Sequence, residues 1–157
     1  MPIFEVRERK KDYLDLLLLA DEQESMIDRY LDKGTMYGLE EGGVVRGVCV
    51  VTDEGCGVLE LKNLAVRPED QRRGYGARLV AFLARRYRGE YRRMQVGTGE
   101  SPLTIPFYER CGFVPSHRVK NFFPEHYDHP IFECGRQLID MVYLTMPLDG
   151  RGSAAGD

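Results

Sequence analysis

The sequence predicts an α/β domain whose central sheet is mixed but mostly antiparallel, with helices on both faces. Residues 36–66 contain three strand candidates separated by tight turns, which favours an antiparallel meander. Residues 59–98 have the order strand, helix, strand, which is typical of a right-handed parallel unit. The chain has 157 residues, of which 43% are apolar, and this suffices for one domain with a hydrophobic core. We expect that domain to span residues 1–148, and the Gly-, Ser- and Ala-bearing tail at 149–157 to be disordered.

Local patterns define each element in turn. Apolar runs or alternation predict strands at residues 3–6, 36–39, 44–51, 58–66, 94–98, 114–122 and 141–146. Apolar positions at helical spacing predict helices at residues 12–20, 22–32, 78–87 and 104–110. Glycines end two of these helices, at Gly34 and Gly112. The stretch 123–130 is aromatic and broken by prolines, and a long loop of this kind inside a compact domain is often functional.

Charge and composition exclude several classes of function. The formal net charge is −3, whereas general nucleic-acid binding requires a basic surface, so we expect no nucleic-acid partner. No charged N-terminal segment precedes a long apolar stretch, and the longest apolar run, residues 16–20, is too short to span a bilayer. We therefore expect a cytoplasmic protein that does not bind membranes.

The four cysteines include no Cys-x-x-Cys pair, so we expect free thiols. His126, His129 and Cys134 are close in the sequence, but they lack recognised zinc spacing. We therefore predict no metal site.

The turn at residues 71–77, Gln-Arg-Arg-Gly-Tyr-Gly-Ala, is the most informative segment of the chain. It lies between a strand and a helix, where unpaired N–H groups meet the positive end of the helix dipole. Gly74 and Gly76 lack a Cβ, so a ligand can approach the backbone closely. Arg72 and Arg73 add charges that suit phosphate. The turn therefore predicts an anion site.

A tight strand-to-helix turn without a ligand is the alternative interpretation, because a single Gly-x-Gly is weak evidence. Leu79 stands where a dinucleotide fingerprint has its third glycine, and the Gly-Lys-Ser/Thr of a P-loop is absent. A binder of nucleotide phosphates remains a separate hypothesis.

Two blocks of the sequence carry a family resemblance. The first is Leu64-Ala65-Val66 followed by Gln71-Arg72-Arg73-Gly74-Tyr75-Gly76-Ala77 and Leu79. The second is Phe107-Tyr108-Glu109-Arg110-Cys111-Gly112-Phe113. In this order, with a strand between them, they resemble the acetyl-coenzyme A signature and the Tyr-x-x-x-Gly-Phe segment of the GCN5-related N-acetyltransferase (GNAT) superfamily. The resemblance covers roughly residues 57–115, and residues 119–146 look like a subgroup of mostly uncharacterised bacterial members.

The resemblance implies acetyl-CoA as the cofactor. Backbone N–H groups of the 71–77 turn would hold its pyrophosphate, and the strand end at 64–66 would pair with its pantetheine arm. That arm would enter where this strand splays from the strand at 94–98. The family often has Asn near the outlet of the second strand, where Glu100 or Ser101 stands here. The implied cofactor-binding residues are Leu64, Ala65, Val66, Gln71, Arg72, Arg73, Gly74, Tyr75, Gly76, Ala77, Thr98, Gly99 and Ser101.

Tyr108 and Glu60 are the catalytic candidates. The resemblance implies that Tyr108 is the general acid, because a phenol can protonate a leaving thiolate whose thiol has a pKa of ~8.5. Glu60 stands where the histone-acetylating members place their catalytic glutamate. A carboxylate there helps to remove the proton of an amine whose pKa is ~10.4. The alternatives are a merely packed tyrosine and a solvated strand glutamate. Without a Ser-His-Asp pattern we expect direct attack by the amine.

The region around residues 122–133 combines aromatic and charged side chains, which suits a pocket for a cationic amine. The predicted substrate-binding residues are Glu100, Phe123, His126 and Tyr127, and Phe122, Asp128 and Glu133 are further candidates. Glu100, His126 and Asp128 are also alternatives to Glu60 as the base. The competing interpretation is a core-packing loop with ordinary surface charges.

We therefore expect an acyltransferase that moves an acetyl group from acetyl-CoA to a primary amine of a small molecule or peptide. A catalytically silent module that senses acetyl-CoA is the alternative, and an assay of thiol release separates the two. The sequence does not select the acceptor. It also leaves open a homodimer formed through edge strands or the 119–146 segment.

Overall fold

The computed structural model describes residues 2–149, so the predicted tail at 149–157 lies outside the described residues apart from Asp149. The main strands are β1 (Ile3–Val6), β2 (Thr35–Glu41), β3 (Val44–Asp53), β4 (Val58–Val66), β5 (Arg93–Gly99), β6 (Val114–Val119) and β9 (Met141–Pro147). A short separate hairpin is formed by β7 (Phe132–Glu133) and β8 (Arg136–Gln137). The α-helices are α1 (Leu14–Ala20), α2 (Glu24–Asp28), α3 (Tyr75–Arg86), α4 (Thr104–Arg110) and α5 (Phe122–His126), with 3-10 turns at Lys10–Tyr13 and Pro68–Asp70.

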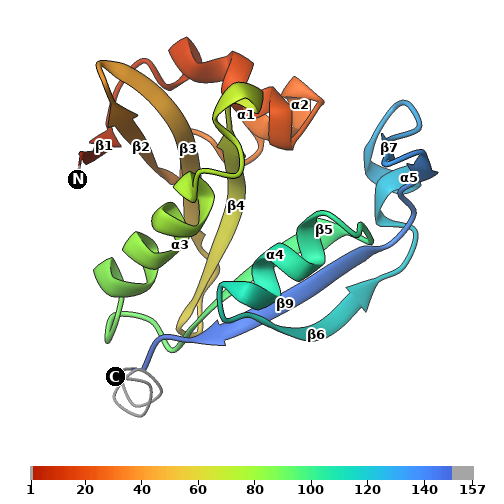
Figure 1. Cartoon of the computed structure of the whole chain (residues 1–157). Coiled ribbons are helices and arrows are strands. Elements are labelled where there is room, and N and C mark those ends of the chain that lie inside the picture. The colour runs from red at the N-terminus through yellow and green to blue at the C-terminus, as the bar shows by residue number, and fades with distance from the viewer. Residues whose placement is uncertain (1, 150–157) are drawn as a thin grey trace.

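The seven main strands form one twisted sheet in the order β1-β2-β3-β4-β5-β9-β6 (Figure 1). Neighbouring strands of this sheet are antiparallel, apart from β4 and β5, which are parallel. Strand β5 follows β4 through α3, so the predicted strand–helix–strand unit is present. The mixed, mostly antiparallel sheet confirms the predicted fold class.

Helices cover both faces of the sheet. On one face, α3 buries residues that recur every three to four positions, among them Leu79 and Leu83, and these pack in one core with Leu59 of β4. On the other face, Leu16 of α1 and Val48 of β3 belong to a second core. Because β4 contributes to both cores, its position is fixed by packing on both sides.

Three helices in the first part of the chain, α1, α2 and α3, differ in extent from their predictions. Helix α3 begins at Tyr75 rather than at residue 78, because Gly74 forms a left-handed N-cap with a φ of 83°. Helix α2 covers only part of the predicted 22–32, and the Lys10 ammonium donates to the carbonyls of Leu31 and Gly34, each at 2.8 Å. The helix predicted from residue 12 instead follows a 3-10 turn and starts as α1 two residues later.

The C-terminal region also differs from its prediction. The strand expected at 114–122 ends at Val119, because Asn121 takes a left-handed φ of 58° and the chain turns into α5. The predicted loop at 123–130 therefore begins inside a helix. The hairpin of β7 and β8 has no counterpart in the sequence prediction.

Within residues 2–149, no helix has the length and apolar character needed to cross a membrane. Cys49, Cys56, Cys111 and Cys134 are free thiols.

Candidate active site

The two parallel strands at the centre of the sheet separate part-way along their length. Strands β4 and β5 are paired from Val58 and Arg93 as far as Leu61 and Val96. Beyond this point β4 runs on to Val66 and β5 to Gly99 without pairing to each other. Figure 1 shows the two strands diverging, with α3 on one side of the opening and α4 on the other. The backbone of β4 from Lys62 onward is therefore open on its β5 side.

A β-bulge at Lys62 accounts for this divergence. Val50 of β3 pairs with Asn63, and the next residue, Val51, pairs with Leu61, so Lys62 has no partner on β3. An extra residue in one strand bends that strand and increases its twist. The bend directs the second half of β4 away from β5.

The separated strands form the walls of a cleft of about 400 Å³. Its lining comes from β4, β5, α4, the end of α1 and the segment that follows α5. The lining residues are Leu19, Ala20, Asp21, Glu22, Leu61, Lys62, Asn63, Leu64, Val96, Gly97, Thr98, Gly99, Thr104, Tyr108, Phe123, Tyr127, Ile131, Phe132, Glu133, Leu138 and Met141.

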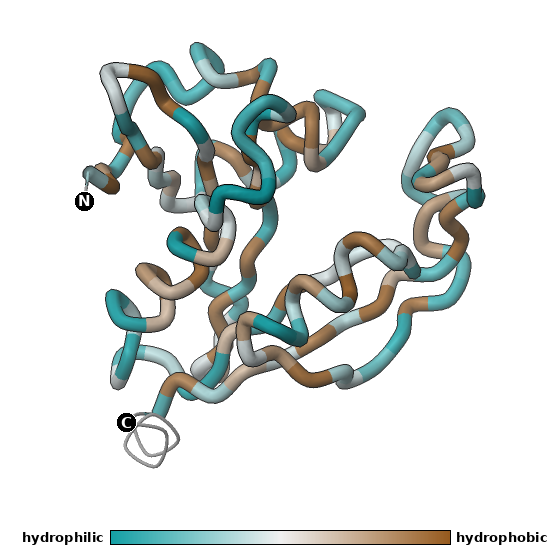
Figure 2. The backbone as a smooth tube through the Cα atoms, viewed as in Figure 1, coloured by the Kyte–Doolittle hydropathy of each residue, from teal (hydrophilic) through white to brown (hydrophobic). Residues whose placement is uncertain are grey.

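The turn between β4 and α3 presents unpaired backbone N–H groups. The first hydrogen bond of the helix runs from Arg78 N–H to the Gly74 carbonyl at 3.0 Å. No backbone hydrogen bond of the described residues uses the N–H groups of residues 72–77. A Cβ built on Gly74 would meet nothing within 4 Å, so the space above this residue is open. Figure 2 shows the turn as a long hydrophilic stretch, and such a helix N-terminus suits an anion.

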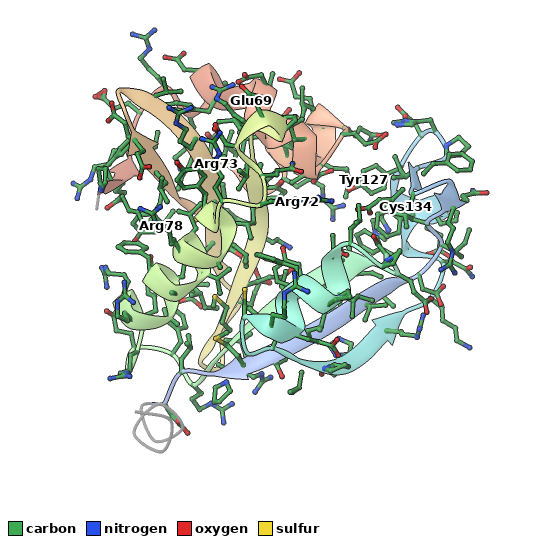
Figure 3. All side chains as sticks on the ribbon, viewed as in Figure 1. Glu69, Arg72, Arg73, Arg78, Tyr127 and Cys134 are labelled. Carbon is green, nitrogen blue, oxygen red and sulfur yellow. The ribbon has the colours of Figure 1, made fainter. Side chains whose placement is uncertain are left out.

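Two arginines lie on different sides of this turn. Figure 3 places Arg72 toward the opening between β4 and β5, and Arg73 on the side of β3. Arg73 forms an ion pair with Asp70 at 3.7 Å. Arg72 has a left-handed φ of 68°.

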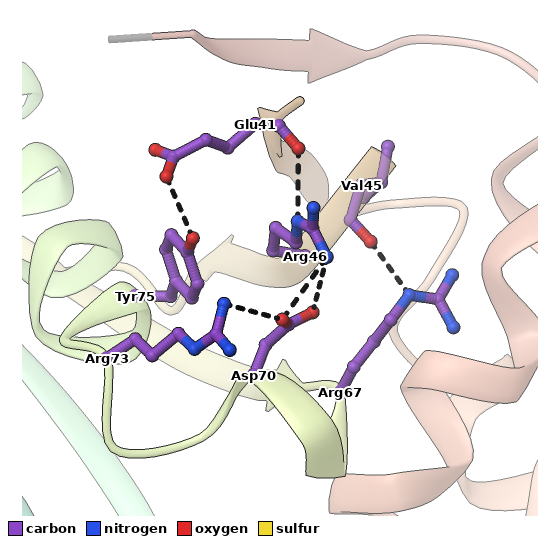
Figure 4. A network of polar contacts seen from close by, with 7 residues as sticks. All are labelled: Glu41, Val45, Arg46, Arg67, Asp70, Arg73 and Tyr75. Atoms are coloured by element: carbon purple, nitrogen blue, oxygen red, sulfur yellow. Dashed lines mark hydrogen bonds and ion pairs between the residues drawn. The ribbon is translucent and has the colours of Figure 1, made fainter. Parts of the chain in front are cut away.

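A buried carboxylate holds the turn in place (Figure 4). Asp70 is only 1% exposed and accepts two hydrogen bonds from Arg46 Nη1, at 3.2 and 3.3 Å. Arg67 Nε donates to the Val45 carbonyl at 2.9 Å, so the start of the turn is tied to β3 as well. These contacts within the protein therefore fix the N–H groups of the turn before any ligand binds.

Asp70→Asn is expected to lower the free energy of unfolding by about 2 kcal/mol, because it leaves the partly buried Arg46 without its carboxylate. Glu69→Gln, an exposed neighbour of the same turn, is the matched control and is expected to change stability by less than about 0.5 kcal/mol. Urea unfolding monitored by circular dichroism measures both. Equal stability of the two variants would show that Asp70 does not hold the turn.

Three predicted cofactor-binding residues are occupied with contacts inside the protein. The Gln71 N–H donates to the Pro68 carbonyl at 3.4 Å, and its side chain donates to the Val66 carbonyl at 3.1 Å. The Tyr75 hydroxyl donates to Glu41 at 2.9 Å. A Cβ on Gly76 would lie 3.1 Å from Phe107 Cζ, so this glycine allows helix packing rather than ligand approach. Of the two glycines in the predicted anion site, Gly74 is therefore the one beside open space, while the N–H groups of residues 72–77 stay unpaired by backbone hydrogen bonds of the described residues.

Of the predicted cofactor-binding residues on or next to β4 and β5, some line the cleft and others make contacts inside the protein. Leu64, Thr98 and Gly99 line the cleft. Ala65 instead belongs to the core beneath α1 and α2. Ser101 is 4% exposed, and its Oγ accepts the Leu103 N–H at 3.1 Å, which supports the start of α4.

Tyr108 lines the cleft from α4. Its ring is buried between Phe107 and Phe113, which contact it edge-on. Its hydroxyl makes no hydrogen bond with the described residues, so it can donate to a ligand. Burial raises the pKa of the Tyr108 phenol above its ordinary value, and the group is therefore protonated at neutral pH.

Glu60 lies outside the cleft lining. It is 5% exposed and accepts hydrogen bonds from Gln95 Nε2 at 2.7 Å and Lys62 Nζ at 3.0 Å. Lys62, in contrast, lines the cleft. Glu60 is thus separated from the cleft by its own donors, and contact with a bound amine would need an intervening water.

The four predicted substrate-binding residues occupy two different environments. Phe123 and Tyr127 line the cleft. Glu100 is exposed and forms an ion pair with Arg118 at 3.0 Å, away from the cleft lining. His126 stacks on Phe122, with its Nδ1 2.8 Å from the Phe122 carbonyl oxygen.

Sequence analysis missed the contribution of the α1–α2 connection. Asp21 and Glu22 line the cleft, and the Tyr127 hydroxyl donates to Asp21 at 2.7 Å. No periodicity relates residues 21 and 127, so this contact was not predictable from local pattern. One signal was available: Asp21 follows a helix C-terminus, where the helix dipole favours a cation over a carboxylate.

Comparison with known proteins agrees with this geometry. The model of the acetyltransferase (GNAT) domain matches residues 32–115. The N-acetyltransferase YvbK of Bacillus subtilis is 35% identical over 147 residues, which cover 92% of this chain and 95% of YvbK. The chain belongs to the GNAT family.

Solved GNAT structures match over nearly the whole chain. A GNAT acetyltransferase from Elizabethkingia anophelis, solved with acetyl-CoA bound, is 32% identical with a TM-score of 0.89, covering 94% of this chain and 97% of its own. An acetyltransferase from Bacillus subtilis in complex with CoA is 34% identical with a TM-score of 0.86, covering 93% and 97%. GNAT membership confirms the predicted family and the prediction of an acyltransferase of the N-acetyltransferase class.

Proposed function

We propose that this GNAT protein transfers the acetyl group of acetyl-CoA to a primary amine by direct attack. The open edges of β4 and β5, next to the unpaired N–H groups of the α3 turn, carry the proposal. The N–H groups of the turn suit an anion, and the open strand edges offer backbone groups to an extended ligand. Together they match a diphosphate joined to a pantetheine arm. The predicted cytoplasmic location and homodimer stay predictions.

The described residues fit this cofactor. The N–H groups of residues 72–77 and the open space above Gly74 would receive the diphosphate, with Arg72 beside it. The unpaired edge of β4 at Lys62–Val66 would align the arm between the strands. When bound, acetyl-CoA supplies an acetyl group activated as a thioester.

The protein supplies proton transfers on either side of the reacting carbon. The Tyr108 hydroxyl donates a proton or hydrogen bond to the departing sulfur, a role for which it is protonated and unpaired. Glu60 accepts the proton of the attacking amine through a water, because the carboxylate itself does not line the cleft. The carboxylate is held in position by Gln95 and Lys62.

Thiol release from acetyl-CoA, measured across a panel of primary amines, tests the proposed function. We expect release that depends on the amine, and CoA should protect the fold against heat better than ATP or NAD. Protection by CoA without release on any amine would favour a sensor instead. Stronger protection by ATP or NAD would contradict the cofactor assignment.

Glu60→Gln is expected to lower kcat by about tenfold, because the amide cannot accept the proton of the attacking amine. Glu90→Gln is the matched control, since Glu90 lies outside the cleft in an exposed pair with Arg86. The measurement is kcat against pH for both variants. A Glu60→Gln profile identical to that of the unaltered protein would assign the base elsewhere.

A further inference from the structure

Asp21 is a carboxylate held by two tyrosines on the wall of the cleft. Its Oδ1 accepts the Tyr127 hydroxyl at 2.7 Å, and its Oδ2 accepts the Tyr30 hydroxyl at 3.2 Å. Asn63 Nδ2 in turn donates to the Tyr30 hydroxyl at 3.0 Å and to the Leu17 carbonyl at 3.0 Å. Each donor fixes the orientation of the carboxylate and leaves it further lone pairs for a ligand.

This carboxylate has no ion-pair partner. Among residues 2–149, no Lys, Arg or His nitrogen lies within ion-pair distance of Asp21. Lys62 approaches the ring of Tyr30, but its ammonium is paired with Glu60 at 3.0 Å. Burial raises the pKa of the Asp21 carboxyl, because an uncompensated charge is costly away from water. A bound cation would remove that cost.

A second polar group at the same wall also lacks a partner. Asn63 is 3% exposed and lines the cleft. Its Oδ1 is the buried side-chain oxygen that no described residue satisfies. Exchange of its amide atoms would not help, because the Leu17 carbonyl next to Nδ2 requires a donor. Buried polar atoms are almost always satisfied, so this oxygen points to a donor that binds with the ligand or with a bound water.

Apolar side chains line the same cleft as Asp21. Leu19 comes from α1, Phe123 from α5, and Ile131 and Phe132 from the segment after α5. The other charged residues that line the cleft are Glu22, Glu133 and Lys62, so carboxylates outnumber ammonium groups, and Lys62 is already paired with Glu60. An ammonium on an apolar skeleton fits both properties of this wall.

We propose that Asp21 binds the ammonium group of the acceptor, and that the acceptor is an alkyl or arylalkyl primary amine without a carboxylate of its own. The inference rests on the proposed acetyl transfer and names the substrate class for the same cleft. An amino acid would bring its carboxylate toward Asp21, Glu22 and Glu133, where like charges repel. Phenethylamine and phenylalanine differ by that carboxylate alone and are therefore the matched ligand pair.

Calorimetric titration of each ligand into CoA-saturated protein tests this inference without turnover. We expect the unaltered protein to bind phenethylamine at least tenfold tighter than phenylalanine. Asp21→Asn should weaken the binding of phenethylamine by about 10- to 100-fold, which is the effect expected from losing a charged hydrogen bond. Its affinity for CoA, measured in the same experiment, should stay within twofold.

Asp28→Asn is the matched control, because it makes the same chemical change on α2 at an exposed residue paired with Lys11. We expect it to leave phenethylamine binding within twofold. Equal effects of the two variants would overturn the inference. So would equal binding of both ligands by the unaltered protein, a comparison that holds even if Asp21→Asn does not fold. If the proposed function is wrong, the unaltered protein will not bind CoA, and this result is distinct from the outcomes above.

Discussion

Tyr108→Phe is expected to lower kcat for acetyl transfer by about 100-fold while leaving CoA affinity within twofold. A positioned acid contributes roughly 10²- to 10⁴-fold, and phenylalanine removes the proton but keeps the ring. The ring contacts with Phe107 and Phe113 should therefore survive the substitution. Steady-state kinetics and calorimetry of CoA binding separate the two effects.

The pH dependence provides a second check on this tyrosine. Burial raises the pKa of the phenol above its ordinary value of ~10, so the protonated form persists to higher pH than in a free tyrosine. Activity that depends on protonated Tyr108 should consequently show no loss below pH ~10 from this group. Tyr91→Phe, outside the cleft, is the control and should leave kcat unchanged. Equal kcat in the Tyr108 and Tyr91 variants would exclude the acid role.

Gly74→Asp is expected to weaken the binding of CoA by about 100-fold. Aspartate and asparagine tolerate a left-handed φ better than other side chains, so Gly74→Asn is the matched control for backbone strain. One added negative charge about 5 Å from a phosphate costs about 3 kcal/mol at an effective dielectric of 20, which corresponds to roughly 100-fold. We expect the asparagine variant to bind CoA within about tenfold of the unaltered protein.

Calorimetry at two salt concentrations measures this difference. The effect of the aspartate is electrostatic, and residue 74 lies beside open space. The difference in CoA affinity between the two variants should therefore decrease as ionic strength rises. Similar affinities of the aspartate and asparagine variants at low salt would place the diphosphate elsewhere.

The parts of the fold that were predicted from the sequence are those that depend on residues close together in the chain. Strand β4, the turn and α3 follow one another directly, and the turn chemistry at Gly74 is a nearest-neighbour property. The parallel pairing of β4 with β5 was also predictable, because a helix of this length between two strands permits few other arrangements. Tyr108, which lines the cleft, was predicted as a site residue because its block resembles a family segment, and its role as the acid stays a prediction.

What was missed depends on contacts between distant residues. Helix α2 ends at Asp28, short of the predicted residue 32, and the chain after it is held by Lys10, whose ammonium donates to the Leu31 and Gly34 carbonyls. The role of Asp21 depends on Tyr127, more than a hundred positions away. Gly76 was assigned to ligand approach, but Phe107 occupies the space beside it. Such pairings become visible only once the chain is folded.

The contact between Asp21 and Tyr127 is accompanied by two others across the same boundary. The Asp128 N–H donates to Gln23 Oε1 at 3.1 Å, and His129 Nε2 lies 3.4 Å from Glu22 Oε1. These contacts fasten the segment after α5 to the α1–α2 connection. The proposed acceptor site therefore uses residues from 19–23 and 121–138, whereas the proposed diphosphate site uses residues 72–77, so substitutions can test the two sites separately.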